Sequence, residues 1–300
     1  MSTMESIATN DATAAGPRLP RRGAAAAARA WRRDRGLVAG LAIIALVALV
    51  GLLAPLIAPH PQAESIGASL QPPGAGHLFG TDDVGFDVFS RVLYAARVDI
   101  GIALAATALS LLVGVPLGIL AGYTRSYAGE LAARVSDTFQ AFPVFIVALG
   151  LAAAAGSKAS NLVFIVAFLN APIYFRLARN QTRVLRNAPF VEASVVAGER
   201  TPRILVRHVL PNAAGPLLAQ ASVNAGWALL LTSGLSFVGA GVRPPTAEWG
   251  AMIANGSEHL LGGEWWPTVF PGLAIMITVL AFGLVSEAIS KRIQGVRDER

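Results

Sequence analysis

The sequence contains no cysteine and few charged residues, and both shortages narrow what the protein can be. Without cysteine, disulfide bonds and thiolate chemistry are excluded. Only 14% of the residues are charged and 54% are hydrophobic, whereas an average soluble domain carries about 25% charged residues. This balance indicates an integral membrane protein.

Lysine is also scarce: it occurs only at Lys158 and Lys291, and neither follows a glycine. A nucleotide-binding P-loop needs the pattern G-x-x-x-x-G-K-[ST], so the chain cannot bind ATP in that way. The histidines show no metal-ligand spacing; they are His60, His77, His208 and His259. We therefore expect this chain to hold no metal or cofactor and to catalyse no reaction.

Charged residues are absent from six stretches, each at or near the roughly 17–25 residues that cross a bilayer as a helix. The stretches are 36–63, 100–124, 138–157, 159–175, 208–242 and 265–286. In lipid, only helices and closed barrels satisfy the backbone, and apolar runs this long fit helices. The sequence therefore predicts an all-α protein with six transmembrane helices and no charge deep in a span, which argues against a secondary carrier.

Arginine and lysine are distributed unevenly between the two sides of this arrangement. Twenty lie in the terminal segments and in loops 125–137 and 176–207, and four lie on the other side. The positive-inside rule then places both termini in the cytoplasm. We expect residues 1–35 to be a disordered basic segment, 36–290 the transmembrane domain, and 291–300 a cytoplasmic tail. The charge favours contact with anionic lipid and not with nucleic acid, because the arginines lie beside spans.

The most informative polar segment covers about residues 187–211 and lies between two apolar stretches. Residues suited to helix starts and ends recur in it: Asn187 and Pro189 for one start, Gly198 for its end, Thr201 and Pro202 for a second start, and Pro211 for the final stop. Two short helices around a glycine elbow would form a compact knob that another protein could grip. A charged loop that only fixes topology is the alternative.

Two other segments predict local structure. Gly114, Gly118 and Gly122 recur every fourth position, and such a ridge lets a second helix approach closely in lipid. Residues 77–100 have apolar positions at helical spacing and fit an amphipathic helix on the outer surface. A simple lead-in to the span at 100–124 is the alternative.

Several segments, taken in order, resemble the inner-membrane permease subunits of ABC importers for dipeptides, oligopeptides and nickel. They are HLFGTDDVGFDVFSRVLYAAR at 77–97, GVPLGILAGY at 114–123, AFPVF at 141–145, VEASVVAGERTPRILVRHVLPN at 191–212, GLSFVGAGVRPPTAEWGAMI at 234–253 and FPGLAIMITVLAF at 270–282. The resemblance covers about residues 35–290 and is greatest to the second, C-type permease of a pair. It implies the type I ABC importer permease fold.

The resemblance also implies how such a chain works. Segment 191–212 is similar to the EAA loop, a coupling helix that docks in a cleft of a separate ATPase subunit. The residues implied in coupling are Glu192, Ala193, Ser194, Gly198, Leu210 and Pro211, with Ser194 standing where alanine is common. The implied partners are a homologous permease in a heterodimer, two ATPase subunits that bind ATP and Mg, and an extracytoplasmic solute-binding protein at a bacterial inner membrane.

We therefore expect a permease subunit that forms a path for peptides or similar small solutes. An importer of nickel chelates or another small solute is the alternative. Two distant alternatives are a stand-alone channel or secondary carrier and a membrane hydrolase that acts through Ser236. Polar residues of the fifth span are candidates to line the path: Ser222, Asn224, Ser233 and Ser236. Hydrogen bonding between helices is their alternative role.

Overall fold

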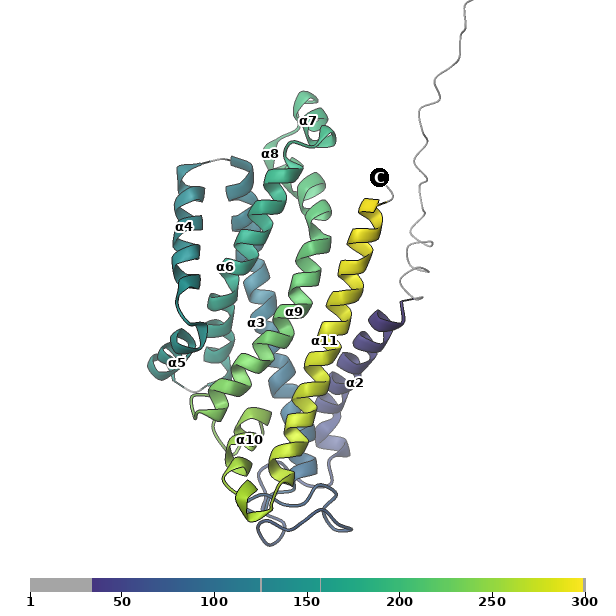
Figure 1. Cartoon of the computed structure of the whole chain (residues 1–300), viewed down its shortest axis with the longest axis vertical. Coiled ribbons are helices and arrows are strands. Elements are labelled where there is room, and N and C mark those ends of the chain that lie inside the picture. The colour runs from purple at the N-terminus through teal and green to yellow at the C-terminus, as the bar shows by residue number, and fades with distance from the viewer. Residues whose placement is uncertain (1–33, 125, 157, 299–300) are drawn as a thin grey trace, which may run out of the picture. The chain divides into compact units, whose positions relative to one another are not determined.

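The structure, a computed structural model, describes residues 34–124, 126–156 and 158–298, and its regular elements in these ranges are helices (Figure 1). They are α2 Arg35–Ile57, α3 Val88–Thr124, α4 Tyr127–Ala141, α5 Val144–Ala155, α6 Ala159–Leu185, α7 Pro189–Val196, α8 Thr201–Ile204, the π-helix η1 Leu205–Val209, α9 Leu210–Phe237, α10 Trp249–Ser257, the 3-10 helix η2 Leu260–Gly262 and α11 Trp266–Asp298. The predicted all-α class is confirmed. The prediction of disorder for residues 1–35 falls, apart from residues 34 and 35, outside the described residues.

Four helices are long and apolar enough to cross a membrane: α2, α3, α6 and α11. The bent pair α4 and α5 supplies up to a fifth span. Helix α9 is long enough at 28 residues, but its Asn, Gln, Ser and Thr residues lower its hydropathy. The fold is thus a multi-pass helical bundle, and the count of six stays a prediction that depends on α9.

The predicted third span, 138–157, is not one straight helix. Helices α4 and α5 are bent by 92° where they meet. Pro143 stands at the break, and the preceding Phe142 is extended, with φ −81° and ψ 145°. Proline restricts the residue before it to extended conformations and removes a backbone donor, which ends α4. Helix α4 also takes in most of the segment 125–137 that was expected to be a loop.

Helix α3 is longer than the stretch 100–124 predicted from charge. It begins at Val88 and has 37 residues, so it is about 55 Å long. Asp87 precedes it, and its Oδ2 accepts a hydrogen bond from the backbone N–H of Ser90 at 2.8 Å, as a helix cap does. Residues 77–100 therefore do not form a separate surface helix, and the alternative of a lead-in to the span is the one observed.

The glycine ridge of α3 packs directly against the backbone of α6. A Cβ atom on Gly114 would lie 2.5 Å from the carbonyl oxygen of Ala171, and one on Gly122 would lie 2.7 Å from that of Arg179. Lipid tails are as apolar as the helices, so close backbone packing has to supply the association that water would otherwise drive. The predicted role of the ridge is confirmed.

Two carboxyl groups meet at the end of the bundle where α10 lies (Figure 1). Asp99 of α3 and Glu248, the cap of α10, are both buried. Asp99 accepts a hydrogen bond from the backbone N–H of Trp249 at 3.0 Å, and Glu248 accepts one from that of Ala251 at 2.7 Å. Two carboxyl groups buried close together disfavour a second negative charge, so the pair tends to hold a proton. The expectation of spans without buried charged residues is therefore wrong for α3.

Adding one methyl group to the glycine ridge tests the contact between α3 and α6. At Gly118 a Cβ would meet the carbonyl oxygen of Phe175, which belongs to a backbone that cannot move aside. We expect Gly118→Ala to lower the free energy of unfolding by about 1–3 kcal/mol, as overpacking does. Gly101 lies on the same helix with no atom within 4 Å of its added Cβ, so Gly101→Ala is the matched control. Equal unfolding curves for the two variants in detergent would contradict this account.

The pH dependence of stability tests the carboxyl pair. Burial raises the pKa of Glu248 above its ordinary 4.5, although hydrogen bonds from Asp99 and the backbone of Ala251 oppose the rise. The folded state then holds the proton more tightly than the unfolded state, so this stabilisation is complete below pH 4.5 and is lost as the pH rises through the raised pKa.

Unfolding in detergent as a function of pH measures this loss. We expect Glu248→Gln, which keeps a side chain able to hydrogen-bond, to flatten the decline in the free energy of unfolding. The exposed Glu258 lies at the other end of α10 as its C-cap, and Glu258→Gln should leave the decline unchanged. If the free energy of unfolding of both variants falls with pH as that of the wild type does, the carboxyl pair does not hold the proton.

Candidate functional site

The segment 187–211, called the knob from here on, connects the end of α6 to the start of α9. It contains α7, α8 and η1 and lies at the opposite end of the bundle from α10 (Figure 1). The sequence predicted two short helices here, and both are present. The knob is therefore a folded structure and not an irregular loop.

The starts of the two short helices differ from the prediction. Helix α7 begins at Pro189 after Ala188, and α8 begins at Thr201 after Arg200. Neither start has a side-chain capping hydrogen bond, so the predicted caps Asn187 and Thr201 are wrong. The residue before a proline is driven to extended conformations, and Ala188 has ψ 142°. Proline in the first turn fixes these starts without a side-chain cap.

The end of α7 is built around Gly198. Its φ is +76°, a left-handed conformation that glycine adopts without a Cβ clash. The N–H of Gly198 donates to the carbonyl of Val195, and the N–H of Glu199 donates to that of Ser194, each at 3.0 Å. These two bonds form a Schellman motif, which satisfies the last carbonyls of a helix. The predicted helix end at Gly198 is confirmed.

Pro211 does not stop the second helix, contrary to the prediction. Helix α8 runs through the π-helical turn η1 into α9, and Pro211 is the second residue of α9. A proline lacks the N–H that an α-helix would bond and crowds the carbonyl one turn earlier. The wider π turn at this place breaks the α pattern locally while keeping the rod intact. Helical backbone therefore continues from the knob into the bundle.

Three apolar side chains attach the knob to the bundle. Val191, Ile204 and Val209 are no more than 1% exposed. They belong to one hydrophobic cluster with residues of α3, α6 and α9: Val115, Ile119, Tyr174, Ala178, Ala213 and Leu217. Burying a Val or Ile side chain is worth about 1.5–3 kcal/mol, so the knob is held firmly against three helices.

Polar contacts brace the knob internally. Glu199 lies beside the glycine elbow, and its carboxylate is 3.0 Å from Nε2 of His208 and 3.4 Å from Nε of Arg203. The Ser194 hydroxyl donates to the carbonyl of Phe190 at 2.9 Å, so this hydroxyl needs no partner from another chain. The sequence analysis did not identify the contacts of Glu199 with Arg203 and His208, which all lie after the glycine elbow.

The outer face of α7 is exposed and partly apolar. Glu192 and Ala193 are exposed, as predicted coupling residues should be, and so are Phe190 at 41%, Val195 at 53% and Val196 at 89%. Exposed apolar side chains gathered at one place mark an interaction surface. Gly198, Leu210 and Pro211 are exposed too, and Ser194 is half-buried. The three apolar residues were missed, although their positions in a polar segment are visible in the sequence.

The four predicted path residues separate into different environments. Ser222 donates to the carbonyl of Phe282 in α11 at 2.6 Å, and Oδ1 of Asn224 accepts from Gln220 at 2.7 Å. Ser233 borders a cavity of about 320 Å³ between α9, α10 and α11. The Ser236 hydroxyl is buried and has no hydrogen-bond partner among the described residues, so no imidazole there could activate it. Their role in a path stays a prediction.

Comparisons with known proteins cover most of the chain. Residues 114–295 match the family described as binding-protein-dependent transport system inner membrane component. Residues 25–73 match the N-terminal TM domain of oligopeptide transport permease C. The first match contains the whole knob and the four predicted path residues.

Three relatives illustrate the similarity. A putative peptide transport system permease protein of Brucella abortus is 37% identical over 263 residues, which is 87% of this chain and 88% of the relative. A probable D,D-dipeptide transport system permease protein of Escherichia coli is 38% identical over 253 residues, 84% and 85% of the two chains. A glutathione transport system permease protein of Pectobacterium atrosepticum is 33% identical over 217 residues, 72% of each chain.

Proposed function

Because the chain belongs to the family of binding-protein-dependent transport system inner membrane components, we propose that it forms, with a homologous permease, the path of an ATP-driven importer for peptides or similar small solutes. It is an ABC importer permease of the C type, a multi-pass membrane transport protein and not an enzyme. Relatives named for peptides, D,D-dipeptides and glutathione support a peptide-like cargo. A nickel chelate or another small solute remains the alternative cargo.

The knob is proposed to dock on a separate ATPase subunit. The exposed apolar side chains of α7, namely Phe190, Val195 and Val196, are the observation that carries this proposal. An apolar face at the end of a membrane bundle needs a protein partner, and binding energy concentrates in such anchors. The chain has no P-loop of its own, so the energy for transport has to come from another polypeptide.

The connection from the knob into the bundle supports a lever-like mechanism. Helical backbone runs from Thr201 through η1 and along α9, and α9 is hydrogen-bonded to α11 through Ser222 and Ser286. A displacement of the knob is then passed to α9 and α11 together. ATP shifts the inward-facing and outward-facing populations only through contacts that differ between these two states.

The proposed assembly has this chain, its homologous permease, two ATPase subunits that bind ATP and Mg, and a solute-binding protein. In it the knob and both termini are cytoplasmic, in a bacterial inner membrane, and the α10 end faces the binding protein. Residues 36–290 form the permease domain, and α11 carries the helix on into the tail, 291–300, as far as Asp298. Uphill flux by the chain alone would favour the distant alternative of a secondary carrier.

A charge placed on the exposed face of α7 tests docking. We expect Val196→Asp and Glu192→Lys to weaken the retention of the ATPase subunits about tenfold or more, because burying an unpaired charge in a contact costs at least about 1–3 kcal/mol. Copurification of the assembled importer measures the retention, and membrane insertion should be normal.

The control places the same charge at the opposite end of the bundle. Leu261 is fully exposed there, so Leu261→Asp should leave ATPase retention unchanged. Docking through α7 is wrong if the two knob variants hold the ATPase subunits and transport as well as the wild type does.

A further inference from the structure

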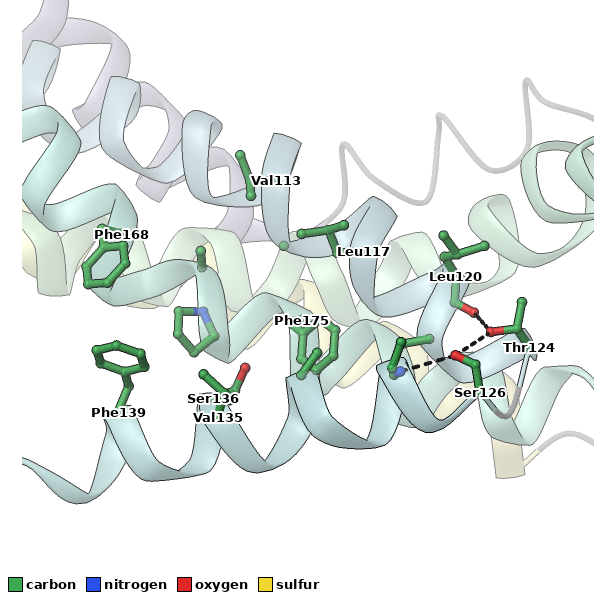
Figure 2. A pocket seen from close by; sticks show the side chains of 17 residues that line it. Val113, Leu117, Leu120, Thr124, Ser126, Val135, Ser136, Phe139, Phe168 and Phe175 are labelled. Carbon is green, nitrogen blue, oxygen red and sulfur yellow. Dashed lines mark hydrogen bonds between the residues drawn. The ribbon is translucent and has the colours of Figure 1, made fainter.

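A deep apolar groove lies between α3, α4 and α6, and the proposed function does not use it. Its volume is about 700 Å³. Figure 2 shows Leu117 and Leu120 of α3 on one wall, Phe139 of α4 on the other, and Phe168 and Phe175 of α6 between them. The rings of Phe139 and Phe168 lie edge to face, 5.5 Å apart, and join the two walls at one end. The groove is open to the surroundings of the bundle and suits a hydrocarbon chain.

A basic cavity of about 580 Å³ adjoins the groove. Ala121 and Ser126 line both spaces. Arg179 and Arg183 of α6 and Arg186, its C-cap, line the basic cavity. Among the described lining residues, Glu130 is the only acid. Both Arg179 and Arg183 share that one carboxylate. The cavity therefore keeps an excess of positive charge.

The arginines retain donors for a further anion. Arg179 is only 8% exposed, and its Nε has no hydrogen-bond partner among the described residues. Arg186 donates to the carbonyl of Tyr123 at 3.0 Å, which holds its guanidinium at the last turn of α3. A buried unsatisfied guanidinium donor is costly, and a phosphate is the anion that matches several arginine forks at once.

The dimensions of the two spaces match one leaflet of a bilayer. The groove follows α3 from Val113 to Thr124, which is about 16 Å of helix. Half of a hydrocarbon core is about 15 Å, so a chain in the groove would reach from the bilayer midplane to the surface. The basic cavity then stands at the depth of the lipid head groups.

We propose that the groove and the basic cavity together bind one anionic phospholipid, in the leaflet on the side of the knob. An acyl chain fills the groove, and the phosphate contacts Arg179, Arg183 and Arg186. Charge complementarity favours this occupant over a zwitterionic lipid, whose cationic group would lie among the arginines. A bound lipid would also support α4, which the structure leaves standing apart from α3 along the groove (Figure 2).

Lipid retention by the purified full-length chain tests the site. The chain is reconstituted with equal amounts of phosphatidylglycerol and phosphatidylcholine, extracted in mild detergent, and the retained lipid is counted by native mass spectrometry. We expect phosphatidylglycerol to be retained about tenfold or more over phosphatidylcholine, because charge-assisted hydrogen bonds separate the two. Equal retention of the two lipids by the wild type would overturn the proposal.

Variants separate the head-group contact from the groove. Arg183→Gln with Arg186→Gln should abolish the preference, whereas Arg200→Gln with Arg207→Gln removes the same charge from the exposed knob and should preserve it. Leu117→Trp fills the groove without changing the charge and should reduce retention of both lipids. Equal loss of preference in the two arginine pairs overturns the proposal, and so does full retention by Leu117→Trp.

A helix of the homologous permease is the other possible occupant of the groove, and cross-linking in the assembled importer tests for it. The chain contains no cysteine, so Phe139→Cys places a unique thiol in the groove. We expect this thiol to react with a lipid-soluble maleimide and not to cross-link to the permease partner. A cross-link to that partner would show that protein covers the groove, and the lipid site would be wrong.

Discussion

The close contact between α3 and α6 is the interaction on which the rest of the structure depends. Glycine at every fourth position of α3 lets the two backbones touch, and Ser110 adds a hydrogen bond to the carbonyl of Ala167 at 3.1 Å. Tyr174 and Ala178 of α6 lie next to this contact and belong to the hydrophobic cluster that contains the buried side chains of the knob. The same two helices also line the apolar groove, together with α4. The proposed coupling and the proposed lipid site thus both depend on this helix pair.

Paired polar groups hold the other helices together in an environment without water. Ser222 and Ser286 join α9 to α11, and Asp99 with Glu248 joins α3 to α10. An unpaired polar group in hydrocarbon is costly, so each of these pairs fixes how two helices meet. The knob differs, because apolar Val196 is exposed there, and in the proposed assembly a protein partner covers it. The family to which the chain belongs supplies that partner in the proposed assembly.

The parts of the fold that depend on local patterns could be predicted from the sequence. Charge-free stretches identified the spans of α2, α3, α6 and α11, the spacing of Gly114, Gly118 and Gly122 identified a packing ridge, and Gly198 identified the end of α7. Predictions from local sequence failed at two prolines, Pro211 and Pro143. Pro211 looked like a helix stop, but the π turn before it accommodates the missing donor. Pro143 stood unnoticed in an apolar run that it divides into two helices.

Contacts between distant residues could not be predicted in this way. Asp99 and Glu248 are far apart in the chain, and nothing near either carboxyl group indicates the other. The difference between buried Val191 and exposed Val196, both on the same short helix, depends on how α7 sits on the bundle. The residues that the resemblance implies in coupling are exposed apart from half-buried Ser194, but the apolar side chains around them required the structure.

The central claim is that this bundle is moved by a motor in other polypeptides through the outer face of α7. Because the chain has no cysteine, Val196→Cys carries a single thiol on that face, and its reaction rate with a water-soluble maleimide can be compared between the chain alone and the assembled importer. The account predicts rapid labelling of the isolated chain and strong protection in the assembly. Equal labelling rates in the two states would contradict it.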